Sequence, residues 1–532
     1  MSHPPSRELI AEVRGQSVFT GEILLRPFNE EGQLRPIGLW AGSRRSFTMG
    51  LQVWLLWGVL ISAFSGTARG SGDPLSFSEA KRDFAQNSGL SALLEVPALR
   101  GARVGALVVH ASDGTEIWSQ SPDMLLAPAS NMKILTSVAA LATLGPSARF
   151  ETQVFSDRLI DSEGTVGQLR VRGSGDPVLN TEDWWRVAAD LRRQGLRRIE
   201  GNLLVDDTAF DDVFWHPAWG PVSSRAYHGP VGALTANYGT FFAHLSPAEE
   251  VDQPPIVVFD PPVEYLRRVG SARTGGMGEA TVLNLSRGEV IPGRESVRID
   301  GTVRLGEKSK AFPRSVSDPG LYAGSVLKMH LESLGVSVGG EVIRGDPSQS
   351  VMLLNFKGRP LSEIISLAMK YSNNAMTEML VKALALNSGE GEGGWPAGMS
   401  VLRERLLAMN IIGEEAILVD GSGLAVTNRV SARMIVNALE VGSHSFGMGP
   451  EFVASLPIAA LDGTLRDRLL PVQGRVRAKT GLLNDSRVIA LSGTVEDGQK
   501  RRKFFSILVN GYPGTARQAM DAVDAWVAEI AR

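Results

Sequence analysis

The spacing of apolar and polar positions predicts an α/β structure at both ends of the chain. Residues 104–117 are typical of a β-hairpin whose two strands are joined by the turn 112–115. From Pro128 to Leu144 apolar residues recur at helical spacing, and Gly145-Pro146 ends that helix. Near the C-terminus, a final helix at 515–531 follows strand-like runs at 475–479, 488–495 and 504–509.

The middle of the chain has a different pattern. Glycine, proline, aspartate and asparagine separate short β-rich runs at 151–155, 167–171, 199–205, 255–259 and 297–303. We predict one clear helix among them, at 183–194, preceded by the capping candidates Asn180 and Thr181 and followed by Gly195. Helical patterns return at 361–386 (broken near 371–374), 399–409 and 431–439. The two ends therefore predict one α/β domain in two parts, 75–150 and 350–532, interrupted by inserted β-rich domains at 151–349.

Composition excludes several classes of protein. The 532 residues are 43% hydrophobic and carry a net charge of −3, which gives no electrostatic reason to expect a nucleic-acid partner. Cysteine is absent, which excludes disulfides, thiolate zinc sites and cysteine nucleophiles. No two of the seven histidines lie four residues apart, so an H-E-x-x-H metal helix is excluded as well.

The N-terminus predicts export. Arg44-Arg45 precedes an apolar run at 49–64, and Gly66 and Ala68 occupy the −3 and −1 positions of a cleavage site. This order is typical of a signal peptide, and the run is shorter than the roughly 20 residues that span a bilayer. We therefore assign 1–68 to an N-terminal extension and signal peptide and expect a periplasmic or cell-envelope protein. The alternative is an uncleaved anchor, which leaves room for peripheral membrane association.

Three short motifs point to nucleophilic chemistry. They are S-x-x-K at Ser130–Lys133, S-x-N at Ser372–Asn374 and K-T-G at Lys479–Gly481. S-x-x-K alone is weak, because it occurs again at Ser78–Lys81 and at Ser325–Lys328. S-x-N and K-T-G occur once each, and the three motifs follow the order used by penicillin-recognising enzymes.

The spacing of the first motif has a physical reason. Residues i and i+3 share a helix face, so the amine of Lys133 can lie beside the Ser130 hydroxyl. A serine hydroxyl is a poor nucleophile until a base takes its proton. Lysine becomes such a base when burial and a nearby positive charge lower its pKa, and Lys479 is the candidate for that charge.

With its flanking blocks, the chain resembles the class C low-molecular-mass penicillin-binding proteins, the D-alanyl-D-alanine carboxypeptidase/endopeptidase family. The resemblance covers about residues 75–532. The blocks that carry it are 127–133, 173–177, 205–210, 420–424, 462–464 and 477–481. The long separation of Ser130 and Ser372 supports it further, because this family inserts domains there. The fold implied is a transpeptidase/β-lactamase-like domain, an antiparallel sheet with helices on both faces.

The resemblance implies a role for each motif residue. Ser130 would attack the D-Ala carbonyl of peptidoglycan stem peptides, and Lys133 would take its proton. β-Lactam antibiotics would act as covalent inhibitors. Ser372 would relay a proton to the leaving amine, and Asn374 would hold the substrate backbone. Lys479 and Thr480 of the K-T-G motif, which Gly481 completes, would bind the terminal carboxylate. No metal or organic cofactor is implied.

Two positions need separate mention. The backbone N–H groups of Ser130 and Leu482 would hold the oxyanion, but the family commonly has Thr or Ser where this chain has Leu482. Asp206 matches a position implicated in binding the diamino-acid side chain of the stem peptide, although the adjacent Asp207 is an alternative match.

Each motif residue also has an ordinary structural interpretation. A serine at a helix start usually caps the helix, a lone lysine is usually solvated, and Asp206 could simply satisfy loop N–H groups. The ordered set favours chemistry instead. Among rival functions, a Ser-His-Asp hydrolase lacks its G-x-S-x-G elbow, a β-lactamase lacks the long insertion, and a non-catalytic peptidoglycan-binding scaffold would not need intact motifs. We expect a serine DD-peptidase.

Overall fold

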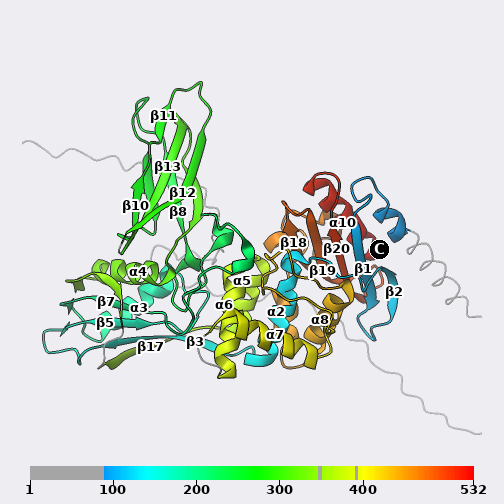
Figure 1. Ribbon diagram of the computed structural model, residues 1–532, viewed down its shortest axis with the longest axis horizontal. Helices are drawn as coiled ribbons and strands as arrows, with labels where there is room; N and C mark the ends of the chain where they lie inside the picture. Colours follow the sequence, from blue (N-terminus) through cyan, green and yellow to red (C-terminus); the bar gives the residue numbers. More distant parts are fainter. Residues whose placement is uncertain (1–88, 292, 346–349, 390–392) are drawn as a thin grey trace, which may run out of the picture. The chain divides into compact units, whose positions relative to one another are not determined.

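The structure is a computed structural model that describes residues 89–291, 293–345, 350–389 and 393–532 (Figure 1). The predicted signal peptide and the S-x-x-K at Ser78–Lys81 lie outside the described residues. Within the described ranges, no helix has both the length and the apolar character needed to cross a membrane.

The two ends of the chain form one antiparallel sheet. Its five strands run in the order β18-β19-β20-β1-β2 (Figure 1). The strands are β1 (Arg103–His110), β2 (Glu116–Gln120), β18 (Val476–Leu483), β19 (Val488–Glu496) and β20 (Arg502–Asn510). β1 pairs with β20 over its whole length, from Arg103 opposite Asn510 to His110 opposite Lys503. The predicted α/β domain in two parts therefore closes through this pair.

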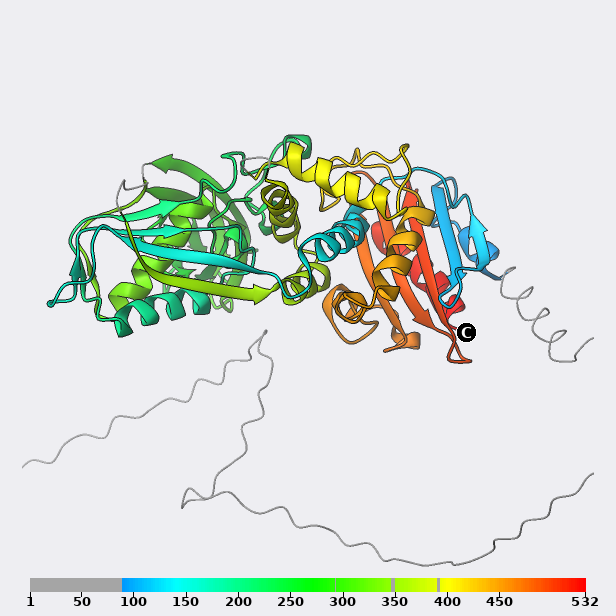
Figure 2. The same cartoon turned by 90° about the horizontal axis from the view of Figure 1, so that it is seen from below.

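Helices cover both faces of this sheet. Because side chains alternate along a strand, Ala106 and Val108 of β1 pack with α10 on one face, while Leu107 and Val109 join the opposite core. Figure 2 shows the helices on the two sides. They are α2 (Met132–Leu144), α5 (Leu361–Lys370), α6 (Asn374–Ser388), α7 (Trp395–Ala408), α8 (Ala432–His444), α9 (Gly449–Ser455) and α10 (Ala516–Ile530). The predicted transpeptidase-like fold class is confirmed.

The intervening segment builds further sheets. A mixed five-stranded sheet has the order β16-β7-β5-β3-β17, formed by β3 (Arg149–Ser156), β5 (Leu169–Arg172), β7 (Leu203–Asp206), β16 (Val342–Arg344) and β17 (Val351–Pro360). The remaining strands are β4 (Thr165–Val166), β6 (Arg198–Ile199), β8 (Thr240–Ser246), β9 (Ile256–Asp260), β10 (Leu266–Val269), β11 (Arg273–Gly275), β12 (Val282–Ile291), β13 (Arg294–Arg304), β14 (Lys310–Ser315) and β15 (Ser337–Val338). β17 pairs with β3, so the inserted sheet extends to Pro360, past the predicted end at residue 349.

This segment contains a helix that the sequence pattern did not predict. Beside α3 (Thr181–Arg193), it has α4 (Pro319–Ser333), which Asp318 caps through the N–H of Leu321. The prediction of one helix was wrong because glycines and serines within α4 weaken its intrinsic helix propensity. The structure explains Gly324, where a Cβ would lie 2.5 Å from Val342 Cγ1 and 2.6 Å from Val205 Cγ1. The absent side chain lets α4 pack close to the sheet.

A buried carboxyl group lies beside the last strand of the inserted sheet. Asp176, in the loop after β5, is 2% exposed and accepts a hydrogen bond from Val178 N–H at 3.0 Å. A Cβ on Gly358 of β17 would fall 1.8 Å from Asp176 Oδ2. Burial, with a smaller contribution from Asp183, raises the pKa of Asp176 to about 7 against the opposing effect of Val178 and Arg359. The folded protein therefore binds this proton more tightly than the unfolded chain.

This proton predicts a pH-dependent stability. The contribution of this proton to the free energy of unfolding is complete below pH 3.8, the ordinary pKa of an aspartate, and is lost as the pH rises through about 7. We expect Asp176→Asn, which is never charged, to raise the free energy of unfolding at pH 8 by about 1–3 kcal/mol, with no gain at pH 4. Thermal unfolding of the wild type and the variant across this pH range measures the difference. Exposed Asp521→Asn on α10 is the control, and equal effects of the two substitutions would contradict the assignment.

Candidate active site

Ser130 lies in a tight turn that leads into α2. The predicted helix start is a 3-10 turn, Ala129–Asn131, and the α-helix begins at Met132. Ala129 has a φ of 46°, a conformation that non-glycine residues seldom adopt. Such strain persists only where the surroundings fix the backbone. The N–H of Ser130 lies at the N-terminal end of this turn, where amide groups have no intrahelical acceptor.

Strands β19 and β20 hold this turn in place. The side chain of Asn510 binds Ala127 twice, accepting from its N–H at 2.9 Å and donating to its carbonyl at 3.0 Å. Asn131 Nδ2 donates to Ser492 Oγ at 2.7 Å. These bonds attach the segment on both sides of Ser130 to the sheet.

Two glycines allow the neighbouring backbone to approach the turn. A Cβ on Gly481 of the K-T-G motif would lie 3.0 Å from both Pro128 O and Ala129 Cβ. A Cβ on Gly423, whose φ is +79°, would lie 1.8 Å from Ala129 O. Gly423 is therefore required by its contact with the turn that carries Ser130, and Gly481 of the K-T-G motif packs tightly against the same turn.

Lys133 is the centre of the site. Its side chain is fully buried, and its Nζ lies 3.0 Å from Ser130 Oγ, 2.8 Å from Asn374 Oδ1 and 2.7 Å from the carbonyl oxygen of Ser422. Burial lowers the pKa of Lys133 to about 8, although the carboxylates of Asp420 and Glu378 act in the opposite direction. The neutral form of this amine is therefore the major one above about pH 8, well below the pH at which an ordinary lysine loses its proton.

Lys479 is a second fully buried lysine, close enough to Lys133 for their charges to interact. Burial, followed by the charge of Lys133, holds the pKa of Lys479 well below its usual range. Its Nζ donates to Ser372 Oγ at 2.7 Å and to the carbonyl of Thr480 at 2.8 Å, and Thr480 Oγ1 donates to Thr464 Oγ1 at 2.8 Å. The sequence predicted that the charge of Lys479 lowers the pKa of Lys133. In the structure, burial lowers the pKa of Lys133, and the charge of Lys133 helps to lower the pKa of Lys479.

The predicted oxyanion donor of β18 is directed away from the sheet. β18 is an edge strand, and Ala478 N–H donates to Pro457 O, outside the sheet. Because backbone groups alternate along an antiparallel strand, the N–H groups of Thr480 and Leu482 point the same way. The Leu482 side chain is 40% exposed. The shared role of Ser130 and Leu482 N–H in holding an oxyanion stays a prediction.

The S-x-N motif occupies the turn between α5 and α6, at the predicted break. Ser372 has a φ of 55°, and Asn374 begins α6. The Asn374 side chain accepts from Lys133 through Oδ1 and donates through Nδ2 to the carbonyl of Tyr227, in the inserted segment, at 3.0 Å. One N–H of this amide is left for the predicted contact with substrate.

Asp206 has different neighbours. Its carboxylate lies 3.6 Å from Arg170 Nη1 and 3.6 Å from Arg172 Nε, and accepts from Thr208 Oγ1 at 2.7 Å. The alternative, Asp207, is paired with Arg344. Both carboxylates thus form ion pairs within the inserted sheet, and binding of a diamino-acid side chain by Asp206 stays a prediction.

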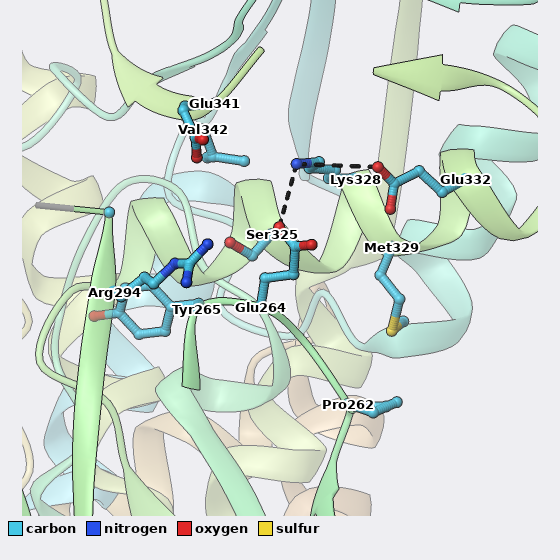
Figure 3. A pocket seen from close by; sticks show the side chains of 11 residues that line it. Pro262, Glu264, Tyr265, Arg294, Ser325, Lys328, Met329, Glu332, Glu341 and Val342 are labelled. Atoms are coloured by element: carbon cyan, nitrogen blue, oxygen red, sulfur yellow. Dashed lines mark hydrogen bonds and ion pairs between the residues drawn. The ribbon is translucent and has the colours of Figure 1, made fainter. Parts of the chain in front are cut away.

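The repeated S-x-x-K at Ser325–Lys328 provides an internal comparison. It lies on α4, beside a small pocket in which Lys328 points toward Glu264 and Glu332 (Figure 3). The Lys328 amine is 3.3 Å from Glu264 and 3.9 Å from Glu332. Lys328 is thus paired with carboxylates, whereas the amine of Lys133 contacts a serine hydroxyl, an amide oxygen and a backbone carbonyl.

Sequence reasoning missed three groups around Lys133. The block at 420–424 supported the family resemblance without a predicted role in the site, yet the carbonyl of Ser422 accepts from Lys133. Behind it lie two fully buried carboxyl groups, Asp420 and Glu378. One signal was available: Glu378 is a charged residue four positions after Asn374, on the same face of α6.

Comparison with known proteins gives consistent matches. The family model of D-Ala-D-Ala carboxypeptidase 3 (S13) matches residues 86–530. A D-alanyl-D-alanine carboxypeptidase of Actinomadura sp. (strain R39) is 34% identical over 510 residues, which is 92% of this chain and 91% of that protein. D-alanyl-D-alanine carboxypeptidase DacB of Haemophilus influenzae is 26% identical over 423 residues, covering 77% of this chain and 86% of the relative.

Solved structures match the fold. The crystal structure of penicillin binding protein 4 (dacB) from Haemophilus influenzae aligns with a TM-score of 0.70 and 24% identity, covering 83% of this chain and 98% of that one. The same protein complexed with a β-lactam aligns with a TM-score of 0.67. The similarity therefore extends through the inserted segment as well as the sheet.

The close approach of Gly423 to Ala129 predicts the effect of a single methyl group. Gly423→Ala would force the loop or the Ser130 turn to move, because the added carbon meets Ala129 O and the φ is unfavourable. We expect a loss of about 2 kcal/mol or more in stability and at least a roughly tenfold slower reaction with a fluorescent penicillin.

Thermal unfolding and time-resolved labelling measure the two effects. Gly447→Ala is the matched control, since no heavy atom lies within 4 Å of the added Cβ. Wild-type labelling by Gly423→Ala would show that the turn does not depend on this contact.

Proposed function

The chain belongs to the D-Ala-D-Ala carboxypeptidase 3 (S13) family, and we propose that it is a serine DD-peptidase whose acyl-enzyme forms on Ser130. Its resemblance to the class C penicillin-binding proteins is confirmed by that membership. As a member it cleaves D-Ala-D-Ala termini of peptidoglycan stem peptides and reacts covalently with penicillin. The assignment of the steps to particular residues is our proposal.

The arrangement around Lys133 carries the proposal. A neutral amine has two N–H groups and one lone pair. The carbonyl of Ser422 and Oδ1 of Asn374 can only accept hydrogen bonds, so they take the two N–H groups. The lone pair is then left for the Ser130 hydroxyl at 3.0 Å, which can donate. The geometry thus directs the proton from Ser130 to Lys133.

Acyl transfer follows in two steps. Ser130 Oγ attacks the carbonyl carbon of the penultimate D-Ala while its proton passes to Lys133, and the C–O bond forms. The C–N bond then breaks, the leaving amine takes a proton through Ser372, and the terminal D-Ala departs. Water next attacks the ester and frees Ser130. In acylation the Ser130 proton passes by way of Lys133 and Ser372 to the leaving amine, and in deacylation one proton of the attacking water returns to Ser130 while its hydroxyl completes the acid product.

The second lysine has a binding role in this scheme. Lys479 and Thr480 would hold the substrate carboxylate, whose negative charge favours the ammonium form that burial disfavours. Ser372 accepts from Lys479, so the hydroxyl that relays the proton is positioned by the group that binds the substrate. The chain would act after export, in the periplasm or cell envelope.

D-Ala cross-links are a second class of substrate. Both reactions break a bond to D-alanine, and they differ only in the group that leaves. Digestion of purified muropeptide monomers and cross-linked dimers by the mature protein separates the two activities.

Ser130→Ala tests the nucleophile. We expect it to abolish labelling by a fluorescent penicillin and to lower muropeptide cleavage by a factor on the order of 10³ or more. Ser325→Ala, in the second S-x-x-K, is the control and should label like the wild type. Persistent label on the wild type supports the peptidase, rapid loss of label would indicate a β-lactamase, and no label would indicate a scaffold.

The pH dependence of acylation tests the base. Only the neutral amine of Lys133 can take the proton, so the second-order rate constant should fall about tenfold per pH unit below the pKa of about 8 and level off above it. Stopped-flow labelling between pH 5 and 10 measures the profile. Lys133→Ala should remove it, and Lys328→Ala should leave it unchanged. A flat profile in the wild type would contradict the assignment of Lys133 as base.

A further inference from the structure

One face of α6 carries three polar residues at four-residue intervals. They are Asn374, Glu378 and Lys382, and this spacing places them on the same side of a helix. Asn374 contacts Lys133. At the other end, buried Lys382 binds the Asp211 carboxylate and donates to the carbonyl of Val213 at 2.7 Å. Glu378 lies between them and has no part in the acyl-transfer steps above.

The Glu378 carboxylate is fully buried and surrounded by donors. It accepts from Ser422 N–H at 2.7 Å, from Gly421 N–H at 3.2 Å and from Trp395 Nε1 at 2.9 Å. Two of these three donors belong to the backbone of the 420–424 loop. A buried carboxylate that binds adjacent backbone amides fixes their positions, since breaking either bond would leave a buried group unsatisfied.

The fixed loop presents its carbonyl to the base. Ser422 donates its N–H to Glu378 and accepts from Lys133 Nζ through its C=O at 2.7 Å. Thr136 Oγ1, on the next turn of α2, donates to Gly421 O at 2.7 Å. Glu378 is therefore separated from the Lys133 amine by a single residue of backbone.

Asp420 shapes the same loop from within. It accepts from the N–H groups of Gly423 and Ala425, each at 2.8 Å, and from Asn428 Nδ2 at 2.7 Å. Trp219 Nε1 of the inserted segment also donates to it, at 2.8 Å. Asp420 thus holds the loop in its turn, whereas Glu378 attaches the loop to α6.

The charges around Lys133 also involve Glu378. Lys133 faces the Glu378 and Asp420 carboxylates on one side and Lys479 on the other, and both carboxylates favour its protonated form. Glu378 itself faces Asp420, Lys133 and Lys382. Burial and then Asp420 raise the pKa of Glu378 to about 7, which is still below the pKa of about 8 of Lys133, so Glu378 loses its proton at lower pH than Lys133 does.

We propose that Glu378 is a positioning residue for acylation, which fixes the Ser422 carbonyl against Lys133 and supplies a buried negative charge to the ammonium formed when Lys133 takes the Ser130 proton. This rests on the proposed function, in which Lys133 is the base. Glu378 touches neither substrate nor Ser130, so its effect passes through the loop and through electrostatics.

Two variants separate position from charge. Glu378→Gln keeps the shape but removes the charge and turns an amide nitrogen toward a donor. We expect its plateau rate, the rate of penicillin acylation at high pH, to fall at least roughly tenfold. We also expect its acid limb, the pH range in which the rate falls, to move to lower pH by about one unit, because Lys133 loses an anion that stabilises its charged form. Glu378→Asp keeps the charge but retracts the carboxylate by one carbon. We expect a lower plateau with the limb near its wild-type position.

The control is Glu404→Gln, an exposed glutamate on α7, which should match the wild type in plateau and limb. If Glu378→Gln has the plateau rate of the wild type and the same position of the acid limb, the proposal is overturned. A fall in melting temperature and plateau with an unmoved limb would overturn it too, because that is the result of a purely structural role. If Glu378→Gln does not fold, Glu378→Asp decides, and an unchanged plateau there refutes the positioning role.

The same measurements keep this proposal distinct from the proposed function. A wild type that shows no label, or a flat pH profile, overturns Lys133 as base and this proposal with it. A wild type with an acid limb and label on Ser130, beside an unaltered Glu378→Gln, overturns the role of Glu378 alone.

Discussion

The structure of the site depends on one buried amine and its three neighbours. Lys133 has no solvent to stabilise its charge, so its protonation is set by Ser130, Asn374, the Ser422 carbonyl and the carboxylates behind them. Each neighbour comes from a different part of the chain. The inserted segment reaches the site through Tyr227 and Trp219, and the sheet reaches it through Asn510 and Ser492. Contacts from the inserted segment and from the sheet thus hold these groups around the buried amine of Lys133.

Much of this arrangement could be predicted from the sequence. The sheet strands and α2 have strong periodicity, and both matched closely, because their apolar faces are buried against the domain's own core. α4 was missed because tertiary packing on the sheet compensates for its glycines. No strand was predicted at the position of β17, whose partner, β3, lies far away in the sequence. Local patterns carry no information about such pairing.

For the site, motifs identified the side chains but not the backbone groups between them. The carbonyls of Ser422 and Tyr227 belong to residues whose side chains gave no catalytic signal. The two S-x-x-K motifs within the described ranges also show that a motif does not define the surroundings of its residues. Lys133 and Lys328 have identical spacing to serine, yet one is buried among neutral acceptors and the other is paired with Glu264. The surroundings of the two lysines, which short motifs do not encode, therefore differ: Lys133 is fully buried, whereas Lys328 is 13% exposed and lies 3.3 Å from Glu264.

The pairing of β1 with β20 has a consequence for biosynthesis. Asn510 holds Ala127 across a separation of 383 residues, and Ser492 holds Asn131 across 361. A ribosome therefore releases the turn bearing Ser130 long before it makes the strands that fix the turn in its strained conformation. Contacts this distant in sequence form late and slowly during folding. A chain shortened before β19 would carry every residue of all three motifs and still lack the two strands that fix the turn bearing Ser130, so the site is complete only when synthesis is nearly finished.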